Sequence, residues 1–301
     1  IIITCAFSYT LKAQNLVLNP SSITHPVLAS KGMVATQHYL ASKVGEDILS
    51  QGGNAYDAAV AVGFALAVVL PRAGNIGGGG FMVMHDASSK ESFSIDYREK
   101  APLKASRDMY LNADGSVNSL RSTIGYLAVG VPGSVYGMWE VHQKFGSIAW
   151  EELLQPAIKL ADGGFIMSPY MTMTLNKVHK KLSQFPSTES IFYKNYPIEF
   201  NTPLTQPDLA RTLTLIAQNG VAGFYEGEVA DKIVDAMEKN GGLISHRDLK
   251  KYRPSWRKPL SSKYKGIDIV TMGPPSSGGI HLIQMLNILE NHDLQAYGHN
   301  N

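Results

Sequence analysis

The amino-acid sequence predicts a layered α/β protein, in which helices pack against β-sheet. Three observations support this prediction. Residues 58–70 are apolar on every face of a helix, residues 81–85 and 92–98 are two strand-like runs joined by a polar turn, and helical patterns recur through the second half of the chain. A helix that is apolar all round has to be buried on all sides, so we expect other layers to enclose it.

The composition agrees with a folded protein and excludes several other classes. Of the 301 residues, 44% are hydrophobic and 17% are charged, and 27 Lys and Arg against 25 Asp and Glu leave a net charge of +2. This hydrophobic fraction excludes a disordered chain, a collagen and a coiled coil. The near-balance of charge gives no reason to expect a nucleic acid partner. The length fits two domains or one large layered domain.

The first residues suggest a targeting signal. We interpret residues 1–14, an apolar stretch with the one cysteine, Cys5, as the remnant of a secretory signal peptide, and residues 15–30 as a polar lead-in to a core at 31–301. We therefore expect a periplasmic or secreted protein without a disulfide framework. A buried first strand is the alternative, because Ile1–Ile3 are β-branched.

The N-terminal elements follow from local spacing. Residues 32–36 are predicted to form a short strand, and the apolar positions within 40–49 predict a first helix, which Gly52-Gly53 ends. Asn54 then caps the apolar helix. Its run of 13 residues, 58–70, is shorter than the roughly 20 that cross a bilayer, so we expect no membrane span.

The elements after the hairpin are less regular. Residues 103–129 look irregular, Val131-Pro-Gly-Ser134 leads into a helix that ends near Gly146, and the polar segment 168–205 is expected to cover the surface. Further helices are predicted at 150–162, 208–219, 226–239 and 279–291, and further strands near 262–266 and 268–272.

Three motifs suggest sites that their context does not support. The glycine-rich stretch 74–80 follows a helix and precedes a strand, the reverse of a phosphate loop, so we expect it to let backbone approach another layer or a substrate. His246-Arg-Asp248 is better explained as a polar helix start, and the segment around Ser134 lacks a glycine of the serine-hydrolase elbow. Because the nine histidines contain no i, i+4 pair, we expect neither a metal nor a cofactor.

Arg98 is the candidate substrate-binding residue. It lies near a strand end, on the same face as Ser94 and Asp96 and next to Glu99. In this position an arginine either forms a surface ion pair, which contributes about 0–1 kcal/mol, or binds a substrate carboxylate with both arms of its guanidinium. The residue types alone favour the ion pair.

Six segments in order resemble the large subunit of γ-glutamyltranspeptidase. They are Gly32-Met-Val-Ala-Thr36, Gly52-Gly-Asn-Ala-Tyr-Asp-Ala-Ala59, Gly74-Asn-Ile-Gly-Gly-Gly-Gly-Phe-Met82, Asp96-Tyr-Arg-Glu-Lys-Ala-Pro102, Val131-Pro-Gly-Ser134 and Pro274-Pro-Ser-Ser-Gly-Gly279. The resemblance covers residues from about 30 to 300. It implies the αββα sandwich of an N-terminal-nucleophile hydrolase, incomplete in this chain, which agrees with the enclosed helix.

The resemblance also implies an activity. In this family a precursor cleaves itself before a threonine, which then opens a small subunit and attacks the γ-amide of glutathione or a related donor. Small-subunit amides stabilise the oxyanion, and water or an amino acid or dipeptide takes the γ-glutamyl group from the enzyme. The motif assigns Arg98 to the α-carboxylate of the donor.

The sequence departs from the family pattern in one respect. It contains no Thr-Thr-His nucleophile motif, since Thr24-His25 precedes the core and lacks the surrounding pattern. We therefore expect residues 1–301 alone to be inactive and to expose an apolar face that the small subunit would cover. Two alternatives stay open: a β-lactam acylase or poly-γ-glutamate depolymerase of the same fold, and a noncatalytic γ-glutamyl-binding module.

Overall fold

The computed structural model describes residues 28–298, and its compact unit begins at Val34. The predicted signal-peptide remnant at 1–14, Thr24-His25 and most of the lead-in at 15–30 lie outside the described residues. The strand predicted at 32–36 is wrong for the part of the chain that the structure describes, where this segment pairs with none of the strands β1–β7. Instead, the hydroxyl of Thr36 donates to the carbonyl of His38, the residue that caps the first helix.

Helices and strands are mixed along the chain, and the predicted α/β fold class is confirmed. The helices are α1 (Tyr39–Ser50), α2 (Ala55–Val69), α3 (Ser134–Phe145), α4 (Trp150–Gly163), α5 (Pro169–Leu182), α6 (Pro186–Phe192), α7 (Pro207–Asn219), α8 (Ala222–Tyr225), α9 (Gly227–Lys239), α10 (His246–Lys251) and α11 (Gly278–Leu289). The strands are β1 (Phe81–Asp86), β2 (Glu91–Asp96), β3 (Phe165–Ile166), β4 (Pro203–Leu204), β5 (Ser255–Arg257), β6 (Leu260–Tyr264) and β7 (Ile267–Thr271).

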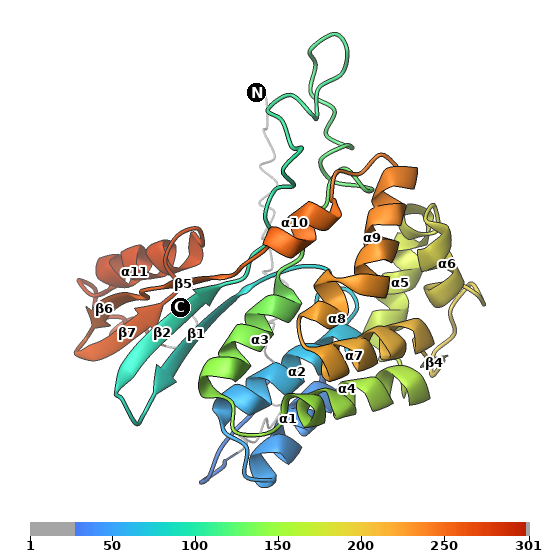
Figure 1. Ribbon diagram of the computed structural model, residues 1–301. Helices are drawn as coiled ribbons and strands as arrows, with labels where there is room; N and C mark the ends of the chain where they lie inside the picture. The colour runs from blue at the N-terminus through green and yellow to red at the C-terminus, as the bar shows by residue number, and fades with distance from the viewer. Residues whose placement is uncertain (1–27, 299–301) are drawn as a thin grey trace, which may run out of the picture. The chain divides into compact units, whose positions relative to one another are not determined.

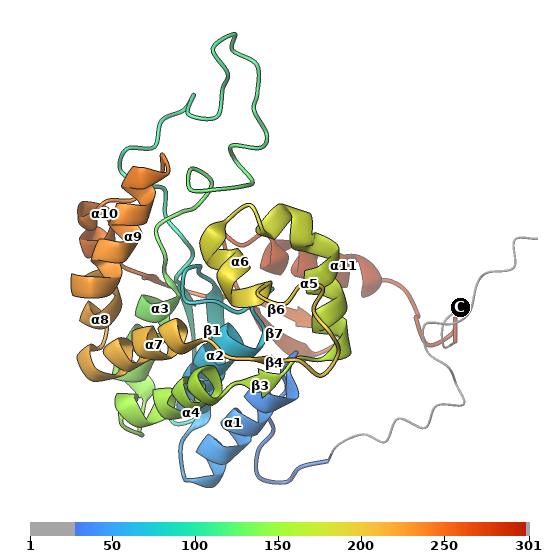
Figure 2. The same cartoon turned by 90° about the vertical axis from the view of Figure 1, so that its right-hand side faces the viewer.

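Helix α2 is the centre of the core, as its apolar run predicts. It packs against α1, α3 and α4, and Val60, Phe64 and Val68 are fully buried (Figures 1 and 2). Burying one such side chain contributes about 1.5–3 kcal/mol. Asn54 caps α2 and forms a capping box with Asp57, whose carboxylate also accepts a hydrogen bond from the backbone amide of Ser147 at 3.0 Å. The buried carboxylate thereby joins the start of α2 to the loop after α3.

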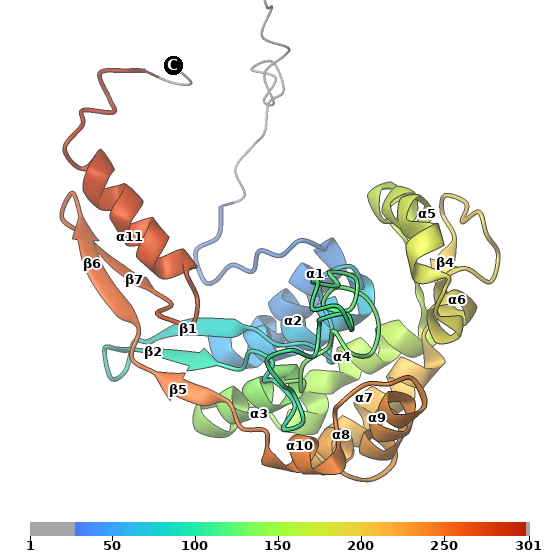
Figure 3. The same ribbon diagram turned by 90° about the horizontal axis from the view of Figure 1, so that it is seen from above.

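The three-stranded antiparallel sheet has the order β1-β2-β5. The helices from α1 to α4 lie on one side of β1 and β2, and β6, β7 and α11 lie on the other (Figures 1 and 3). The predicted β1–β2 hairpin is confirmed, although β2 ends at Asp96 rather than at residue 98. Strand β5, a short strand between Pro254 and Pro259 that pairs with β2, was not predicted.

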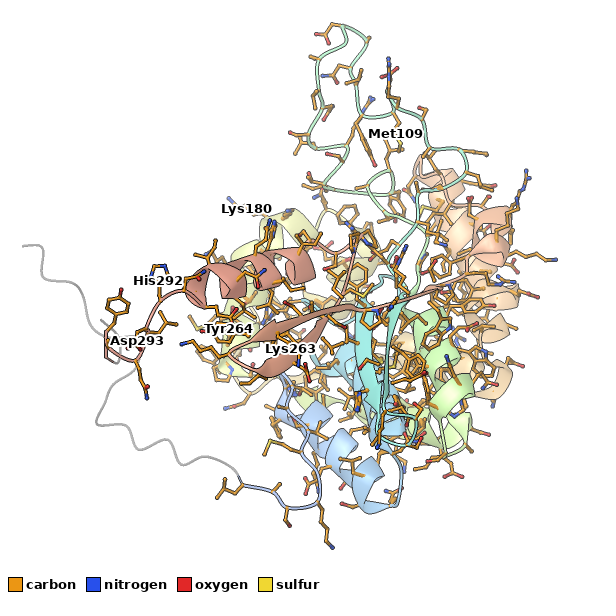
Figure 4. All side chains as sticks on the ribbon, turned by 90° about the vertical axis from the view of Figure 1, so that its left-hand side faces the viewer. Met109, Lys180, Lys263, Tyr264, His292 and Asp293 are labelled. Atoms are coloured by element: carbon orange, nitrogen blue, oxygen red, sulfur yellow. The ribbon has the colours of Figure 1, made fainter. Side chains whose placement is uncertain are left out.

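The last strands form a second hairpin, β6–β7, on which α11 packs. Strand β6 ends at Tyr264, two residues before the predicted end, because Lys265 and Gly266 have positive φ angles of 47° and 81° and make the turn. Figure 4 shows Lys263 and Tyr264 near the end of β6.

Two long segments complete the chain. Residues 103–129 are irregular, as predicted, and Figure 4 shows Met109 on this loop, away from the helices and strands. The segment 168–205 is largely helical. It contains α5 and α6, which both begin with a proline. The side chain of Ser168 caps α5.

Candidate functional site

Arg98 follows the end of β2, and its backbone is held on both sides. Its amide donates to Asp96 Oδ1 at 3.1 Å, and its carbonyl accepts from the Tyr252 hydroxyl at 2.9 Å. The hydrogen bonding between β1 and β2 continues one residue beyond the end of β2, since the Tyr97 amide donates to the Gly80 carbonyl at 3.0 Å. The side chain of Arg98 is exposed. The fold therefore fixes the backbone of this residue and leaves its guanidinium accessible.

The glycine-rich stretch packs directly against this backbone. A Cβ on Gly79 would lie 2.5 Å from the Tyr97 carbonyl oxygen and 2.8 Å from Arg98 Cα, far inside ordinary contact. Glycine is required here because only a residue without a side chain allows the two segments to come so close. For Gly79, this confirms the predicted role in close backbone approach.

The same stretch also occupies the start of α3. The Gly78 carbonyl accepts hydrogen bonds from the backbone amides of Gly133 and Ser134, at 2.7 and 3.0 Å. Free amides at a helix start favour anion binding, but here a carbonyl already uses two of them. The start of α3 therefore offers fewer free amides to an anion in this region.

Asp96 is paired with a different arginine. Its side chain is only 9% exposed, and its Oδ2 lies 2.9 Å from Arg257 Nε and 2.8 Å from Nη2. The antiparallel register places Arg257 opposite Ser94, whose hydroxyl donates to the Arg257 carbonyl at 2.8 Å. Within residues 28–298, Arg98 takes part in no ion pair. The ion-pair alternative for Arg98 is therefore not realised in the described part of the chain.

Tyr252 connects this region to the segment after α10. Burial, followed by the nearby charges of Asp96 and Glu99, raises the pKa of its hydroxyl well above the ordinary value. The hydroxyl therefore stays protonated at neutral pH and can donate to the Arg98 carbonyl. Burial also raises the pKa of Tyr97.

The outer end of β5 is packed among aromatic rings. Lys144 Nζ lies 4.4 Å from the centroid of the Phe93 ring and 4.5 Å from that of Trp256. The indole nitrogen of Trp256 donates to Glu140 Oε2 at 3.2 Å. These contacts hold the strand that carries Arg257 against α3.

Two cavities on the surface differ in their position relative to Arg98. A cavity of about 620 Å³ lies between α7 and α9, and none of the residues around Arg98 lines it. A smaller one of about 150 Å³ is lined by Lys100, Val131, Asp248 and Tyr252, close to the Arg98 backbone. His246 and Asp248 open α10, where Asp248 and Ser245 form a capping box, so the polar helix start predicted there is confirmed.

Residues 28–298 contain no group of three or more His, Cys, Asp or Glu side chains that could bind a metal. Among the same residues, every helix is too short or too polar to cross a membrane.

Sequence reasoning found Arg98 but not the residues that hold it. Tyr252 and Arg257 follow no motif, and their contacts with Asp96 and Arg98 join segments more than 150 positions apart in the chain. The Ser-x-x-Asp pattern at 245–248 was the one local signal, and it indicates only the start of α10.

The mixed helices and sheets match solved structures of gamma-glutamyltranspeptidases and of the Bacillus anthracis transpeptidase CapD, which is consistent with the predicted class of N-terminal-nucleophile hydrolases. Residues 41–301 match the family model described as gamma-glutamyltranspeptidase, and the chain belongs to this family. The predicted family is thereby confirmed.

Individual relatives agree with this assignment. The glutathione hydrolase proenzyme of Escherichia coli (strain K12) is 45% identical over 278 residues, which cover 92% of this chain and 48% of that protein. The acylase ACY 1 proenzyme of Pseudomonas sp. (strain V22) is 40% identical over 280 residues, covering 91% and 50%. The crystal structure of Helicobacter pylori gamma-glutamyltranspeptidase matches with a TM-score of 0.89 and 46% identity, covering 92% of this chain and 80% of that one. The chain spans about half the length of these curated relatives.

Proposed function

We propose that the complete protein transfers γ-glutamyl groups from glutathione or related γ-glutamyl amides to water or to an amino acid or dipeptide. In this proposal Arg98 binds the α-carboxylate of the donor, and a threonine outside residues 1–301 attacks the γ-carbonyl. The γ-glutamyl group passes through an ester with that threonine, whose own α-amine acts as the base. The family and the two glutathione hydrolase and transpeptidase relatives support this reaction class.

The proposal depends on the exposed guanidinium and the fixed backbone of Arg98. Its guanidinium is exposed and takes part in no ion pair within residues 28–298, while its backbone is fixed by Asp96 and Tyr252. A guanidinium presents two parallel N–H groups that match the two oxygens of a carboxylate. An arginine whose backbone is fixed and which has no acidic partner among residues 28–298 is therefore suited to orient a donor for attack at its other end.

Replacing Arg98 with alanine in the complete protein tests this role. We expect the donor KM to rise roughly 30- to 800-fold, which corresponds to about 2–4 kcal/mol for a lost bidentate contact. The kcat should change little, because the α-carboxylate is remote from the reacting carbonyl and is bound equally before and during the reaction.

Arg107→Ala is the matched control, since this arginine is 91% exposed and lies in the irregular segment 103–129. It removes the same charge and should leave the donor KM unchanged. Arg98→Lys keeps the charge but loses the two-armed contact, and it should fall between the wild type and Arg98→Ala. An unchanged KM in Arg98→Ala would remove Arg98 from the substrate site.

The proposal includes a partner, a small subunit that self-cleavage of a precursor releases. Helix α11 exposes two large apolar side chains, Met285 (55%) and Ile288 (63%). Exposed apolar patches of this kind commonly mark an interface. We propose that the small subunit covers this face, which would place it beside the β6–β7 hairpin.

Two measurements test this partner. Residues 1–301 expressed alone should not turn over a γ-glutamyl anilide, and turnover would contradict the need for a threonine elsewhere. In the complete protein, Ile288→Glu should weaken the association of the two subunits, measured by size-exclusion chromatography, because it would bury a charge. Gln218→Glu on α7 adds the same charge at an exposed position and should have no effect.

An acylase of the same fold is the second candidate, because the acylase ACY 1 proenzyme is 40% identical. The two functions differ in the donor they require. An amide donor that lacks the α-amino acid group should be a poor substrate for the proposed transferase and a good one for an acylase. A noncatalytic γ-glutamyl-binding module would bind glutamate but turn over neither donor.

We propose in addition that the protein is exported to the periplasm or secreted, as the interpretation of residues 1–14 suggests. Fractionation of cells that express the complete protein from its own gene would test this. Recovery of the activity with the cytoplasmic fraction would contradict it.

A further inference from the structure

The carboxylate of Asp96 could pair with the guanidinium of Arg98 and make it unavailable to a donor. Asp96 precedes Arg98 by two residues and binds its amide through Oδ1, so a carboxylate lies within reach of the Arg98 guanidinium. Two opposite charges this close attract each other strongly where burial reduces screening. An uncompensated Asp96 would therefore compete with a donor carboxylate for the same guanidinium.

Arg257 removes this competitor. It places two nitrogens, Nε and Nη2, within 2.9 Å of Asp96 Oδ2, while Oδ1 remains bound to the Arg98 amide. Both oxygens of the carboxylate are thus occupied without the Arg98 side chain.

We propose that Arg257 is a positioning residue for the donor: by neutralising Asp96 it keeps the Arg98 guanidinium free for the α-carboxylate. This inference rests on the proposed function of Arg98. Arg257 itself does not contact the donor in this scheme.

The sheet presents Arg257 to Asp96 through its register. Arg257 lies directly opposite Ser94 and diagonally from Asp96, a separation that a long side chain spans on one face of an antiparallel pair. The Ser94 hydroxyl fixes the Arg257 carbonyl, and the packing of Trp256 against Lys144 holds the neighbouring residue. These contacts hold the backbone of Arg257 in place, so that its guanidinium reaches Asp96.

Two nearby cations, Lys100 and Arg253, are engaged elsewhere. Lys100 donates to the Arg253 carbonyl at 2.7 Å and lies over the ring of Tyr252. Arg253 donates to the carbonyls of Lys250 and Tyr252. In the described part of the chain, the ion pair of Asp96 is with Arg257.

Steady-state kinetics of the complete protein test the inference. In Arg257→Met, Asp96 becomes free to pair with Arg98, so the donor KM should rise about tenfold while kcat stays within about twofold. The inhibition constant of L-glutamate as a competitor should rise in parallel. Arg257→Lys keeps a positive charge beside Asp96 and should recover most of the loss.

The double variant Asp96→Asn/Arg257→Met separates positioning from a purely structural role. It removes the competing charge together with its partner, so the donor KM should return to within about threefold of the wild type. A KM that stays high in the double variant would overturn the inference, as would an unchanged KM in Arg257→Met. Because the double variant leaves no unpaired buried charge, it also provides the test if the single variant fails to fold.

The outcome distinguishes this inference from the proposed function. If Arg98→Ala raises the donor KM and Arg257→Met does not, only the positioning role is wrong. If Arg98→Ala leaves the KM unchanged, the carboxylate-binding role of Arg98 is wrong, and the inference about Arg257 is overturned with it.

Discussion

A methyl group on Gly79 should displace the backbone that carries Arg98. The nearest atoms to such a Cβ are all backbone: the Tyr97 carbonyl oxygen at 2.5 Å, Arg98 Cα at 2.8 Å and the Glu99 nitrogen at 2.8 Å. Backbone cannot rotate out of the way as a flexible side chain can. The single carbon added by Gly79→Ala should therefore shift the backbone of Arg98, the proposed substrate-binding residue.

The size of the effect follows from these distances. Ordinary contact begins at 3.4 Å, so the two segments must separate by about 0.9 Å at the closest point. Overpacking of this kind costs about 1–3 kcal/mol of unfolding free energy. A misplacement of about 1 Å also impairs the orientation of a bound substrate, and we expect the donor KM to rise about tenfold.

Gly77→Ala provides a control within the same stretch. A Cβ at Gly77 meets no atom within 4 Å, and its φ angle is not in the left-handed region. Urea unfolding of both variants in the complete protein should show a loss for Gly79→Ala alone, and donor kinetics should follow the same order. Equal stability and equal KM in the two variants would refute the argument that Gly79 is required for close backbone approach.

Three other predictions concern buried polar groups. Asp57→Ala leaves the amide and hydroxyl of Ser147 without their acceptor and should lower the unfolding free energy by about 3 kcal/mol in urea titrations. Burial alone would raise the pKa of Asp57 and of Asp248, but hydrogen bonds, led by those from Ser147 and Ser245, together outweigh it and hold both pKa values below the ordinary 3.8. Their stabilisation is therefore complete above about pH 4 and is lost as the pH falls through the lower folded values, which urea midpoints between pH 6 and 2.5 would measure. Tyr252→Phe removes the donor to the Arg98 carbonyl and should cost about 1 kcal/mol in unfolding free energy, with a donor KM several-fold higher in steady-state assays.

Local chemistry explains which parts of the fold the sequence predicts. Asn54 and the apolar residues after it specify both the cap and the burial of α2, and the alternating residues around the 86–91 turn specify the β1–β2 hairpin. The strand predicted at 32–36 is wrong because strand formation depends on a partner that is not local in the sequence. Its β-branched residues suit a strand, but a strand exists only where another strand pairs with it, and no local signal reports that partner.

The candidate site is predictable only in part, for the same reason. Arg98 is identified by its motif, yet the residue that pairs with Asp96 comes from a position 161 residues further along the chain. Strand β5, which brings it there, is three residues long and lies between prolines, so its pattern is too short to recognise. The contact arises from tertiary pairing of β2 with β5 rather than from any local preference.

The aromatic surroundings of Lys144 also give the protein an intrinsic spectroscopic label. Trp256 is adjacent to Arg257 in β5, and a cationic nitrogen lies 4.5 Å from its ring, so a shift of this strand would change the electric field at the indole and its emission. The other tryptophans, Trp139 and Trp150, pack edge to face at 4.9 Å on the helical side. With phenylalanine at those two positions, Trp256 would be the one tryptophan left in residues 1–301, and its emission would report the movement of β5 without any chemical modification.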